Sequence, residues 1–323
     1  MAAPPSDDPE QVGFLLIPGF ALLSYASAIE PLRAANQLSG RALYRWLHLT
    51  PDGRPAAASN GVAIPADAAL ADARGLGAVI VCAGGNPAEF RDPATLAWLR
   101  RAARRMRLGG VSGGPWVLAR AGVLHGYRLT LHWEHAAAFA EEYPELDLRR
   151  TLFELDRDRL TCSGGTAPLD MMHALIAREH GPSLAMAVSE WLLQTQIREG
   201  ANPQRMALRD RTGVASPAVL RALAAMERAT ETLLPRLALA AEAGVSPRQV
   251  ERLFRQHLGR TPGEHYLRLR LDRARLLLRQ SELSVLEVAV ACGFVSASHF
   301  TRAYRRAYGH APSAERAPRR MQS

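Results

Sequence analysis

One segment of the chain has the spacing of a catalytic turn. Residues 110–114 read Gly-Val-Ser-Gly-Gly, which matches the G-x-S-x-G signature of a nucleophilic serine between a strand and a helix. Acyl transfer at Ser112 would also require a histidine base and a carboxylate that orients it. The best available partners are Asp156 or Asp158 and His173, but His173 lies in a helical pattern without turn residues. We therefore do not favour hydrolysis, and a serine hydrolase or amidase stays the alternative.

A second set of residues points to a different chemistry, because one pattern occurs twice near the end of the chain. Residues 243–262 and 292–312 each predict the end of a helix, a glycine turn and a second helix that closes on Gly-x-x-Pro. Aligned with one inserted residue in the second turn, Arg252 matches Arg302 and Phe254 matches Tyr304. Each second helix is apolar on one face and carries arginines on the other. Two tandem helix-turn-helix units make DNA the first partner to consider.

The charge distribution supports this interpretation. The chain has no lysine, so its 40 basic residues are all arginine. Residues 1–234 carry 24 arginines and 24 acidic residues, whereas residues 235–323 carry 16 arginines and 7 acidic residues. The whole net charge of +9 therefore belongs to the last quarter of the chain. A codon preference for arginine explains the missing lysine but not the local loss of acids, so the basic segment is typical of a nucleic-acid-binding domain.

The helix signals identify the side chains that would face DNA. In the first unit Ser246 and Gln249 form a predicted capping box, and the helix buries Val250 and Phe254. In the second unit Ser284 and Glu287 cap the leading helix. The outward residues that we predict to bind DNA are Arg248, Glu251, Arg252, Arg255, Ser298, His299, Arg302 and Arg305. Whether each arginine pairs with a guanine edge or with a phosphate stays open.

A single helix over residues 263–280 is predicted between the two units. Eighteen residues at about 1.5 Å each give a rigid spacer of about 27 Å. That length is close to one turn of duplex DNA, about 34 Å. We expect the two units to enter two successive major grooves on one face of the duplex.

The neutral part of the chain alternates short apolar runs with helical patterns, which predicts an α/β sheet. Residues 202–232 contain turn signals around a predicted helix at 218–230, and we interpret this stretch as a linker with interdomain packing. The predicted strands cover residues 12–17, 46–49, 78–82, a run ending at 111, 128–132 and 159–162. The predicted helices cover residues 27–38, 93–106, 116–121, 136–142, 167–180 and 184–198.

The basic segment resembles the AraC/XylS-type DNA-binding domain over residues 235–315. The resemblance rests on residues 289–305, Ala-Val-Ala-Cys-Gly-Phe-Val-Ser-Ala-Ser-His-Phe-Thr-Arg-Ala-Tyr-Arg, and on the trailing Gly-His-Ala-Pro at 309–312. It implies base-reading positions at Arg248, Glu251 and Arg252 in the first unit. In the second unit it implies Ala297, Ser298, His299 and Arg302. Ala297 is too short to donate or accept a hydrogen bond, so it is set aside.

The neutral segment resembles the PfpI-like (class I glutamine amidotransferase-like) domain of GlxA-family transcriptional regulators. The matching segments are residues 14–20 (Phe-Leu-Leu-Ile-Pro-Gly-Phe), 29–36, 81–85, 110–126 and 129–133. In the enzymatic relatives the turn carries a cysteine, usually followed by a histidine, whereas this chain has Ser112 and Gly113. A serine hydroxyl is a far poorer nucleophile than a thiolate unless a base activates it. The resemblance therefore implies a sensing pocket in place of a catalytic cleft.

The family positions imply which residues line that pocket. Glu30 would supply a counter-charge to a cationic ligand, and Trp133 or Trp116 would present a ring face to a quaternary ammonium group. Tryptophans are more often core anchors, and His132 has the alternative role of a structural histidine. The resemblance is strongest to regulators of amine catabolism, which implies betaine, carnitine or an arginine-like effector. The candidate ligand-binding residues are Glu30, Gly84, Gly85, Ser112, Gly113, His132 and Trp133.

The expected fold is a flavodoxin-like, PfpI-type α/β sandwich followed by an all-α tandem helix-turn-helix domain. We predict a disordered lead-in over residues 1–10, a sensing domain over 11–200, a linker with an interdomain helix over 201–234, the DNA-binding domain over 235–315 and a tail over 316–323. The three cysteines share no ligand spacing with histidines, so neither a disulfide framework, nor a metal, nor a cofactor is expected. The expected partners are promoter DNA, a small-molecule effector, a second copy of the chain and RNA polymerase, in the cytoplasm; the expected regulatory effect is activation.

Overall fold

The sheet of the first domain is centred on β6 (Ala78–Ala83), whose six residues are all buried. An apolar strand without polar alternation belongs in the middle of a parallel sheet that is covered on both faces. In the computed structural model, which describes residues 8–316, β6 lies between β1 (Glu10–Leu16) and β7 (Arg107–Ser112) and runs parallel to both. The register places Ala83 opposite Ser112, so these two strands end at the same edge of the sheet.

Seven strands form this sheet in the order β10-β11-β7-β6-β1-β2-β5. The parallel strands β2 (Tyr44–Thr50), β5 (Ala68–Ala69) and β11 (Arg159–Cys162) extend it, and β10 (Phe153–Asp156) adds an antiparallel edge. Two short pairs lie outside the sheet, β3 (Ala56–Ala57) with β4 (Ala63–Ile64) and β8 (Arg128–Leu129) with β9 (Asp147–Leu148). This arrangement confirms the predicted α/β class.

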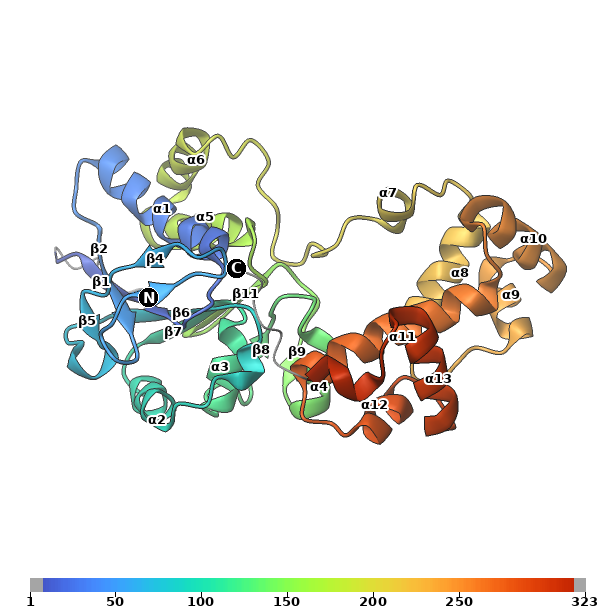
Figure 1. The fold of residues 1–323 in the computed structure, drawn as a ribbon. Helices are drawn as coiled ribbons and strands as arrows, with labels where there is room; N and C mark the ends of the chain where they lie inside the picture. The colour runs from blue at the N-terminus through green and yellow to red at the C-terminus, as the bar shows by residue number, and fades with distance from the viewer. Residues whose placement is uncertain (1–7, 317–323) are drawn as a thin grey trace. The chain divides into compact units, whose positions relative to one another are not determined.

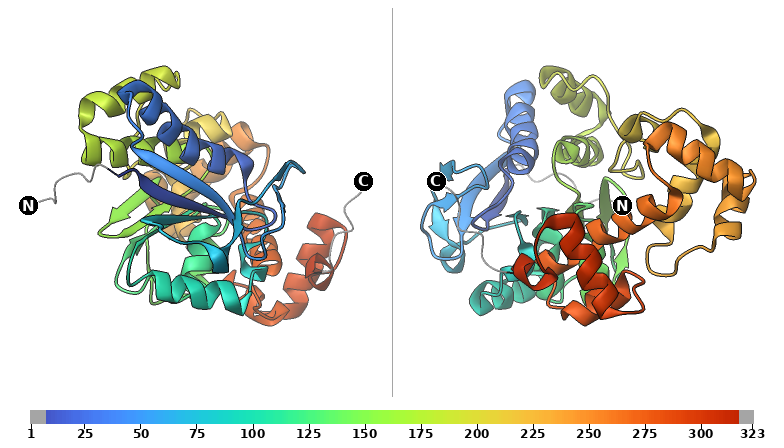
Figure 2. Two further views of the ribbon diagram at one scale, coloured as in Figure 1. Left: turned by 90° about the vertical axis from the view of Figure 1, so that its left-hand side faces the viewer. Right: turned by 45° about the vertical axis from the view of Figure 1, so that its right-hand side comes forward.

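Helices cover both faces of the sheet (Figures 1 and 2). One layer contains α1 (Leu22–Ser39), α5 (Ala167–His180) and α6 (Pro182–Trp191), which pack on one another and share a buried cluster with Phe14 and Ile80. The opposite layer contains α2 (Pro93–Ala102) and α3 (Gly114–Arg120), with α3 packed on β6 and β7. A further helix, α4 (Ala136–Glu142), and two 3-10 turns, η1 (Leu70–Asp72) and η2 (Pro87–Glu89), connect these elements.

The chain divides after Gln204 into a second, helical unit. Its first half contains α7 (Leu208–Thr212), α8 (Pro217–Arg228), α9 (Arg236–Ala243) and α10 (Pro247–Leu258). Apolar residues of α8, α9 and α10 form one core with Tyr266. The long helix α11 (Pro262–Gln280) then leads to α12 (Val285–Ala291), α13 (Ala297–Tyr308) and the turn η3 (Pro312–Arg316). The second half is held by tilted and edge-on contacts among the rings of Phe294, Phe300 and Tyr304.

The structure reproduces several predicted bounds and corrects others. Residues 136–142, 159–162 and 167–180 have the predicted bounds. The helix predicted over 184–198 ends at Trp191, because Leu193 adopts a left-handed backbone (φ 57°). The strand predicted over 128–132 stops at Leu129, because the amide of Thr130 donates to the Thr161 hydroxyl (3.0 Å). Helix α1 begins at Leu22 and not at residue 27, and α2 ends at Ala102 and not at residue 106.

The segment expected as a linker has a different role. Helix α8, predicted as an interdomain helix, contributes Val219, Leu223 and Met226 to the core of the helical unit. An amphipathic helix buries its apolar face where a core accepts it, and the sequence alone did not identify that core. Glu10 begins β1 and Arg316 ends η3, so the expected lead-in and tail each lose a residue. Residues 1–7 and 317–323 lie outside the described residues. Over residues 8–316 no helix has both the length and the apolar character of a membrane span.

Candidate effector pocket and DNA-reading helices

Ser112 stands at a strained turn between β7 and α3. Its backbone has φ of 59°, a left-handed conformation that is uncommon for residues other than glycine. The two glycines that follow are needed because the turn lies directly on β6. A Cβ atom on Gly114 would lie 2.0 Å from the Val81 carbonyl oxygen, and one on Gly113 would lie 2.9 Å from Cβ of Pro87. The chain thus retains the geometry of a nucleophile turn.

Several loops meet Ser112 at this edge of the sheet. The amide of His132 donates to the Ser112 carbonyl (3.2 Å), and the amide of Gly113 donates to the Ala83 carbonyl (3.0 Å). Gly164 is so close that an added Cβ would lie 2.8 Å from Cβ of Ser112. Ser24, at the start of α1, accepts a hydrogen bond from the Gly165 amide (2.8 Å). The sequence offered no signal for the contribution of Ser24.

The two other glycines predicted for the pocket lie in the loop after β6. Gly84 packs against the loop that precedes α1, where an added Cβ would lie 2.9 Å from the Gly19 carbonyl oxygen. Gly85 has φ of 60°, which favours glycine. Since β6 and β7 end side by side, this loop and the Ser112 turn lie at the same edge of the sheet. Gly84, Gly85, Ser112, Gly113 and His132 are therefore brought together.

His132 and Trp133 form an aromatic pair beside this turn. Their ring centroids lie 5.4 Å apart, and 40% of Trp133 is exposed. Burial lowers the pKa of His132, and the charge of Glu134 offsets this only in part. The imidazole is therefore neutral near pH 7 and does not repel a cation. The Glu134 amide donates to Nδ1 of His132 (3.3 Å), which leaves Nε2 as the protonated nitrogen.

Glu30 lies in a different cluster. Its carboxylate accepts two hydrogen bonds from Arg33 (2.6 and 2.8 Å), and the Arg33 guanidinium stands 4.8 Å from the ring centroid of Trp191. Glu30 lies six residues after Ser24 along α1, more than one helical turn away. The structure therefore gives the Glu30 charge a partner on its own helix and does not place it in the hydrogen-bonded set around Ser112.

The residues considered for a catalytic trio are not brought together. Asp158 directly precedes β11, and its carbonyl accepts a hydrogen bond from the Leu108 amide (3.1 Å) at the start of β7. Ser112 lies four residues further along β7, about 13 Å away at the other end of the strand. Nδ1 of His173 lies 2.9 Å from the Ser189 hydroxyl of α6. Asp156 pairs with Arg159 at the same end of β11 as Asp158, so none of the three groups is placed to relay a proton to or from Ser112.

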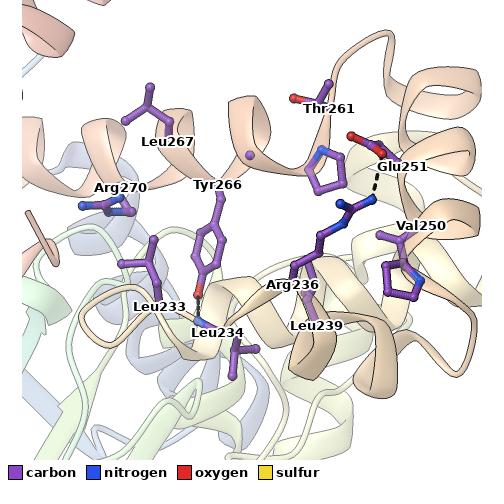
Figure 3. Close-up of a pocket in the computed structure, with 13 residues that line it drawn as sticks. Leu233, Leu234, Arg236, Leu239, Val250, Glu251, Thr261, Tyr266, Leu267 and Arg270 are labelled. Atoms are coloured by element: carbon purple, nitrogen blue, oxygen red, sulfur yellow. Dashed lines mark hydrogen bonds and ion pairs between the residues drawn. The ribbon is translucent and has the colours of Figure 1, made fainter.

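The helix predicted to read DNA in the first unit is α10. A capping box between Ser246 and Gln249 begins it, as predicted. The side chains of Arg248, Arg252 and Arg255 are exposed, and Val250 and Phe254 point into the core. Glu251 differs from its neighbours because its carboxylate is turned toward Arg236 of α9 (3.1 Å). This ion pair lies in the wall of a groove of about 390 Å³ between α9, α10 and α11 (Figure 3).

The helix predicted to read DNA in the second unit is α13. Ser298, His299, Arg302 and Arg305 are exposed on it, and Phe300 and Tyr304 are buried. The 19 residues of α11 that separate the two units span about 28 Å. Seven of the eight predicted DNA-binding residues therefore occupy the outer faces of two helices joined by one rigid spacer, and Glu251 is instead turned into the groove between α9, α10 and α11.

Two charged residues that hold the second unit on α11 were missed by the sequence analysis. Arg270 is 7% exposed, its Nε donates to the Cys292 carbonyl (2.6 Å), and its guanidinium stacks 3.9 Å from the Phe294 ring centroid. The Glu315 carboxylate, 3% exposed, pairs with Arg275 (2.9 Å) and Arg279 (2.7 Å). A usable signal existed for Arg270, because it stands four residues after Tyr266 and four before Ala274 on the buried face of the helix.

Comparison with known proteins adds the family. The model of the DJ-1/PfpI family matches residues 11–178, and a helix-turn-helix domain model matches residues 239–317. The chain is similar to the HTH-type transcriptional regulator CdhR of Pseudomonas aeruginosa, with 47% identity over 94% of this chain and 90% of the relative. It is 45% identical to the HTH-type transcriptional regulator GlxA of Rhizobium meliloti, over 98% of both chains.

This chain is a GlxA-type, AraC-family transcriptional regulator.

A crystal structure of an AraC family transcriptional regulator from Pseudomonas putida covers 57% of this chain, with 31% identity and a TM-score of 0.52. In this GlxA-type regulator the Ser112 turn belongs to a DNA-binding protein and not to an enzyme. Within the described part of the chain, no three His, Cys, Asp or Glu residues are grouped to hold a metal ion.

Proposed function

We propose that the first domain binds a small nitrogenous cation at the Ser112 edge, and that α10 and α13 bind promoter DNA. The main support is that the Ser112 turn keeps its strained geometry (φ 59°) while His173 and Asp158 lie elsewhere. A strained backbone persists where the surrounding structure holds it and often marks a ligand site. Here it is built without the groups that chemistry would require, which favours binding over turnover.

The aromatic pair indicates the class of effector. An exposed tryptophan ring attracts a quaternary ammonium or guanidinium group through its π face. A neutral His132 adds a polar group without a competing positive charge. We therefore propose betaine, carnitine or an arginine-like compound as the effector, with the regulator acting in the cytoplasm as an activator of amine or amino-acid catabolism genes.

Gln204, the last residue of the first domain, offers a route by which effector binding can influence the DNA-binding domain. The side-chain amide nitrogen of Gln204 lies within hydrogen-bond distance of the carbonyl oxygens of Leu131 (3.0 Å) and Thr151 (2.8 Å) and of the Thr130 hydroxyl (3.0 Å). Leu131 directly precedes His132. An effector that moves residues 130–133 also moves the anchor of the segment leading to the helical unit, and an effector shifts an equilibrium only through such differential contacts. We further propose that the regulator acts as a homodimer and contacts RNA polymerase.

Thermal denaturation of the full chain in the presence of glycine betaine, carnitine or arginine tests the site. A ligand at one hundred times its Kd stabilises the folded state by about 2.7 kcal/mol. We expect Trp133→Ala to abolish this stabilisation. Trp191→Ala is the matched control, because Trp191 is exposed to a similar extent (42% against 40%) in another cluster. Equal losses in the two variants would refute the site, and the absence of stabilisation by all three compounds would refute the effector class.

A further inference from the structure

A long stretch of the first domain has no acidic residue. Between Asp92 and Glu134 the chain carries seven arginines and no Asp or Glu. The fold supplies distant carboxylates to three of these arginines: Arg107 pairs with Glu10 and Glu179, Arg120 pairs with Glu142, and Arg128 lies near Glu154 and Asp156.. The fold therefore places a carboxylate beside each of these three arginines and neutralises their charge.

The other four arginines receive no carboxylate. Within residues 8–316, Arg100, Arg101, Arg104 and Arg105 are exposed and form no ion pair. Favourable interaction with the carboxyl end of α2 accounts for Arg100 and Arg101, which lie in its last turn. It does not account for Arg104 and Arg105, which lie beyond the helix. Four adjacent positive charges on a domain that carries 19 arginines and 21 acidic residues thus need another explanation.

A hollow of about 540 Å³ lies among these side chains. It is lined by Arg101, Arg104 and Arg105 from one segment and by Arg74 from the loop before β6, with Trp98 beside them. The Arg74 guanidinium is held in place, because it donates to the carbonyls of Ala71 (2.7 Å) and Ala73 (2.9 Å). The hollow lies where β6 and β7 begin, at the opposite edge of the sheet from Ser112. It is therefore separate from the proposed effector site.

We propose that this arginine hollow binds the phosphate backbone of the duplex beside the operator. Four guanidinium groups without carboxylate partners line the hollow, which exceeds what a small monoanion requires and matches a polyanion. Guanidinium groups form paired hydrogen bonds with phosphate oxygens. The helical domain tethers the first domain to DNA, which raises the effective concentration of flanking duplex at the hollow. The inference rests on DNA binding by the helical domain and adds a second, sequence-independent contact.

The test uses the full chain and a duplex that it selects from a random pool. The duplex is prepared with about 5 and with about 25 base pairs beyond the selected site. The patch variant is Arg101→Gln/Arg105→Gln. The control variant is Arg45→Gln/Arg150→Gln, which removes two exposed arginines that form no ion pair among the described residues. Affinity is measured by fluorescence anisotropy between 50 and 200 mM salt.

We expect the wild type and the control variant to bind the long duplex more tightly than the short one, and with a steeper dependence on salt. Each phosphate contact contributes about 0.9 to the slope of log affinity against log salt concentration. The slope of the patch variant, which lacks two arginines, should therefore be shallower than that of the wild type by about 2, and only on the long duplex. Equal slopes for the patch and control variants on the long duplex would overturn the proposal. An equal loss on both lengths would also overturn it. If the wild type selects no duplex, DNA binding by the helical domain fails first.

Discussion

Replacing Glu315 by glutamine should destabilise the helical domain alone. This carboxylate is 3% exposed and joins η3 to α11 through Arg275 and Arg279. Removing one member of a buried ion pair costs about 3–5 kcal/mol when the other charge is left without a partner. Arg275 and Arg279 are 30% and 33% exposed, so their guanidinium groups regain some hydration. We therefore expect a loss of about 2–3 kcal/mol.

The assay uses the distribution of tryptophan. The first domain contains all five tryptophans, Trp46, Trp98, Trp116, Trp133 and Trp191. Their fluorescence therefore follows the unfolding of that domain, whereas circular dichroism at 222 nm follows the helices of both domains. In urea, with a slope of about 1–3 kcal/mol per molar, the helical transition should move down by about 1–2 M. The fluorescence midpoint should not move. Glu242→Gln, which breaks an exposed pair with Arg228, is the control and should cost less than about 1 kcal/mol.

The pH dependence of the stability tests the contribution of the Glu315 carboxylate independently. Burial by itself would raise the pKa of Glu315, but hydrogen bonding and charge from Arg279, with the charge of Arg275, outweigh it and lower the pKa below the ordinary 4.5. Stability from a depressed carboxyl pKa is present above the unfolded value and is lost as the pH falls through the folded value. The difference between the wild type and Glu315→Gln should therefore persist down to about pH 4.5 and shrink below it. An unchanged helical transition, or an equal shift in fluorescence, would refute the reasoning.

Three further predictions concern the reading helices and the Ser112 turn. Arg252→Ala and Arg302→Ala should each weaken binding to a selected duplex by about 1–3 kcal/mol; unchanged affinity and sequence preference in both would exclude α10 and α13 as reading helices. Ser112→Ala and the wild type should be equally inactive toward ester and amide substrates, and any turnover lost in the variant would restore the hydrolase alternative. Gly114→Ala should destabilise the first domain by about 3 kcal/mol in fluorescence-monitored unfolding, because its Cβ would meet the Val81 carbonyl; an unchanged midpoint would contradict this.

Periodicity was sufficient for the elements whose local pattern and packing agree. Each of these patterns favours a single secondary structure, and the fold has that structure. Examples are the capping boxes, the buried stripes of α10 and α13 and the uniformly apolar β6. The sequence analysis missed the short β10 and the early end of α6, because the backbone there is determined by interactions with residues that are distant in the sequence. Residues after α6 leave the helix as Gln194 and Arg198 bind the buried Asp170 carboxylate.

The candidate site divides in the same way. Ser112, Gly113 and the glycines after β6 could be predicted because a strained turn leaves a local signature in residue type. The sequence contains little or no local signature for Ser24, Gln204 and Arg270, since each of them binds residues far away in the chain. Glu30 shows the converse, because a family position predicted a counter-charge that the structure gives to Arg33.

By itself, the sequence determined that two arginine-bearing helix-turn-helix units follow a neutral α/β domain. These features depend on spacing, capping and charge, which are local or additive along the chain. Only the tertiary structure decided which charges are matched. It supplied carboxylates to Arg107, Arg120 and Arg128, left Arg104 and Arg105 without them, and separated Ser112 from Asp158 by the length of a strand. Electrostatic pairing depends on distance in space, and the chain brings those groups together or apart only by folding.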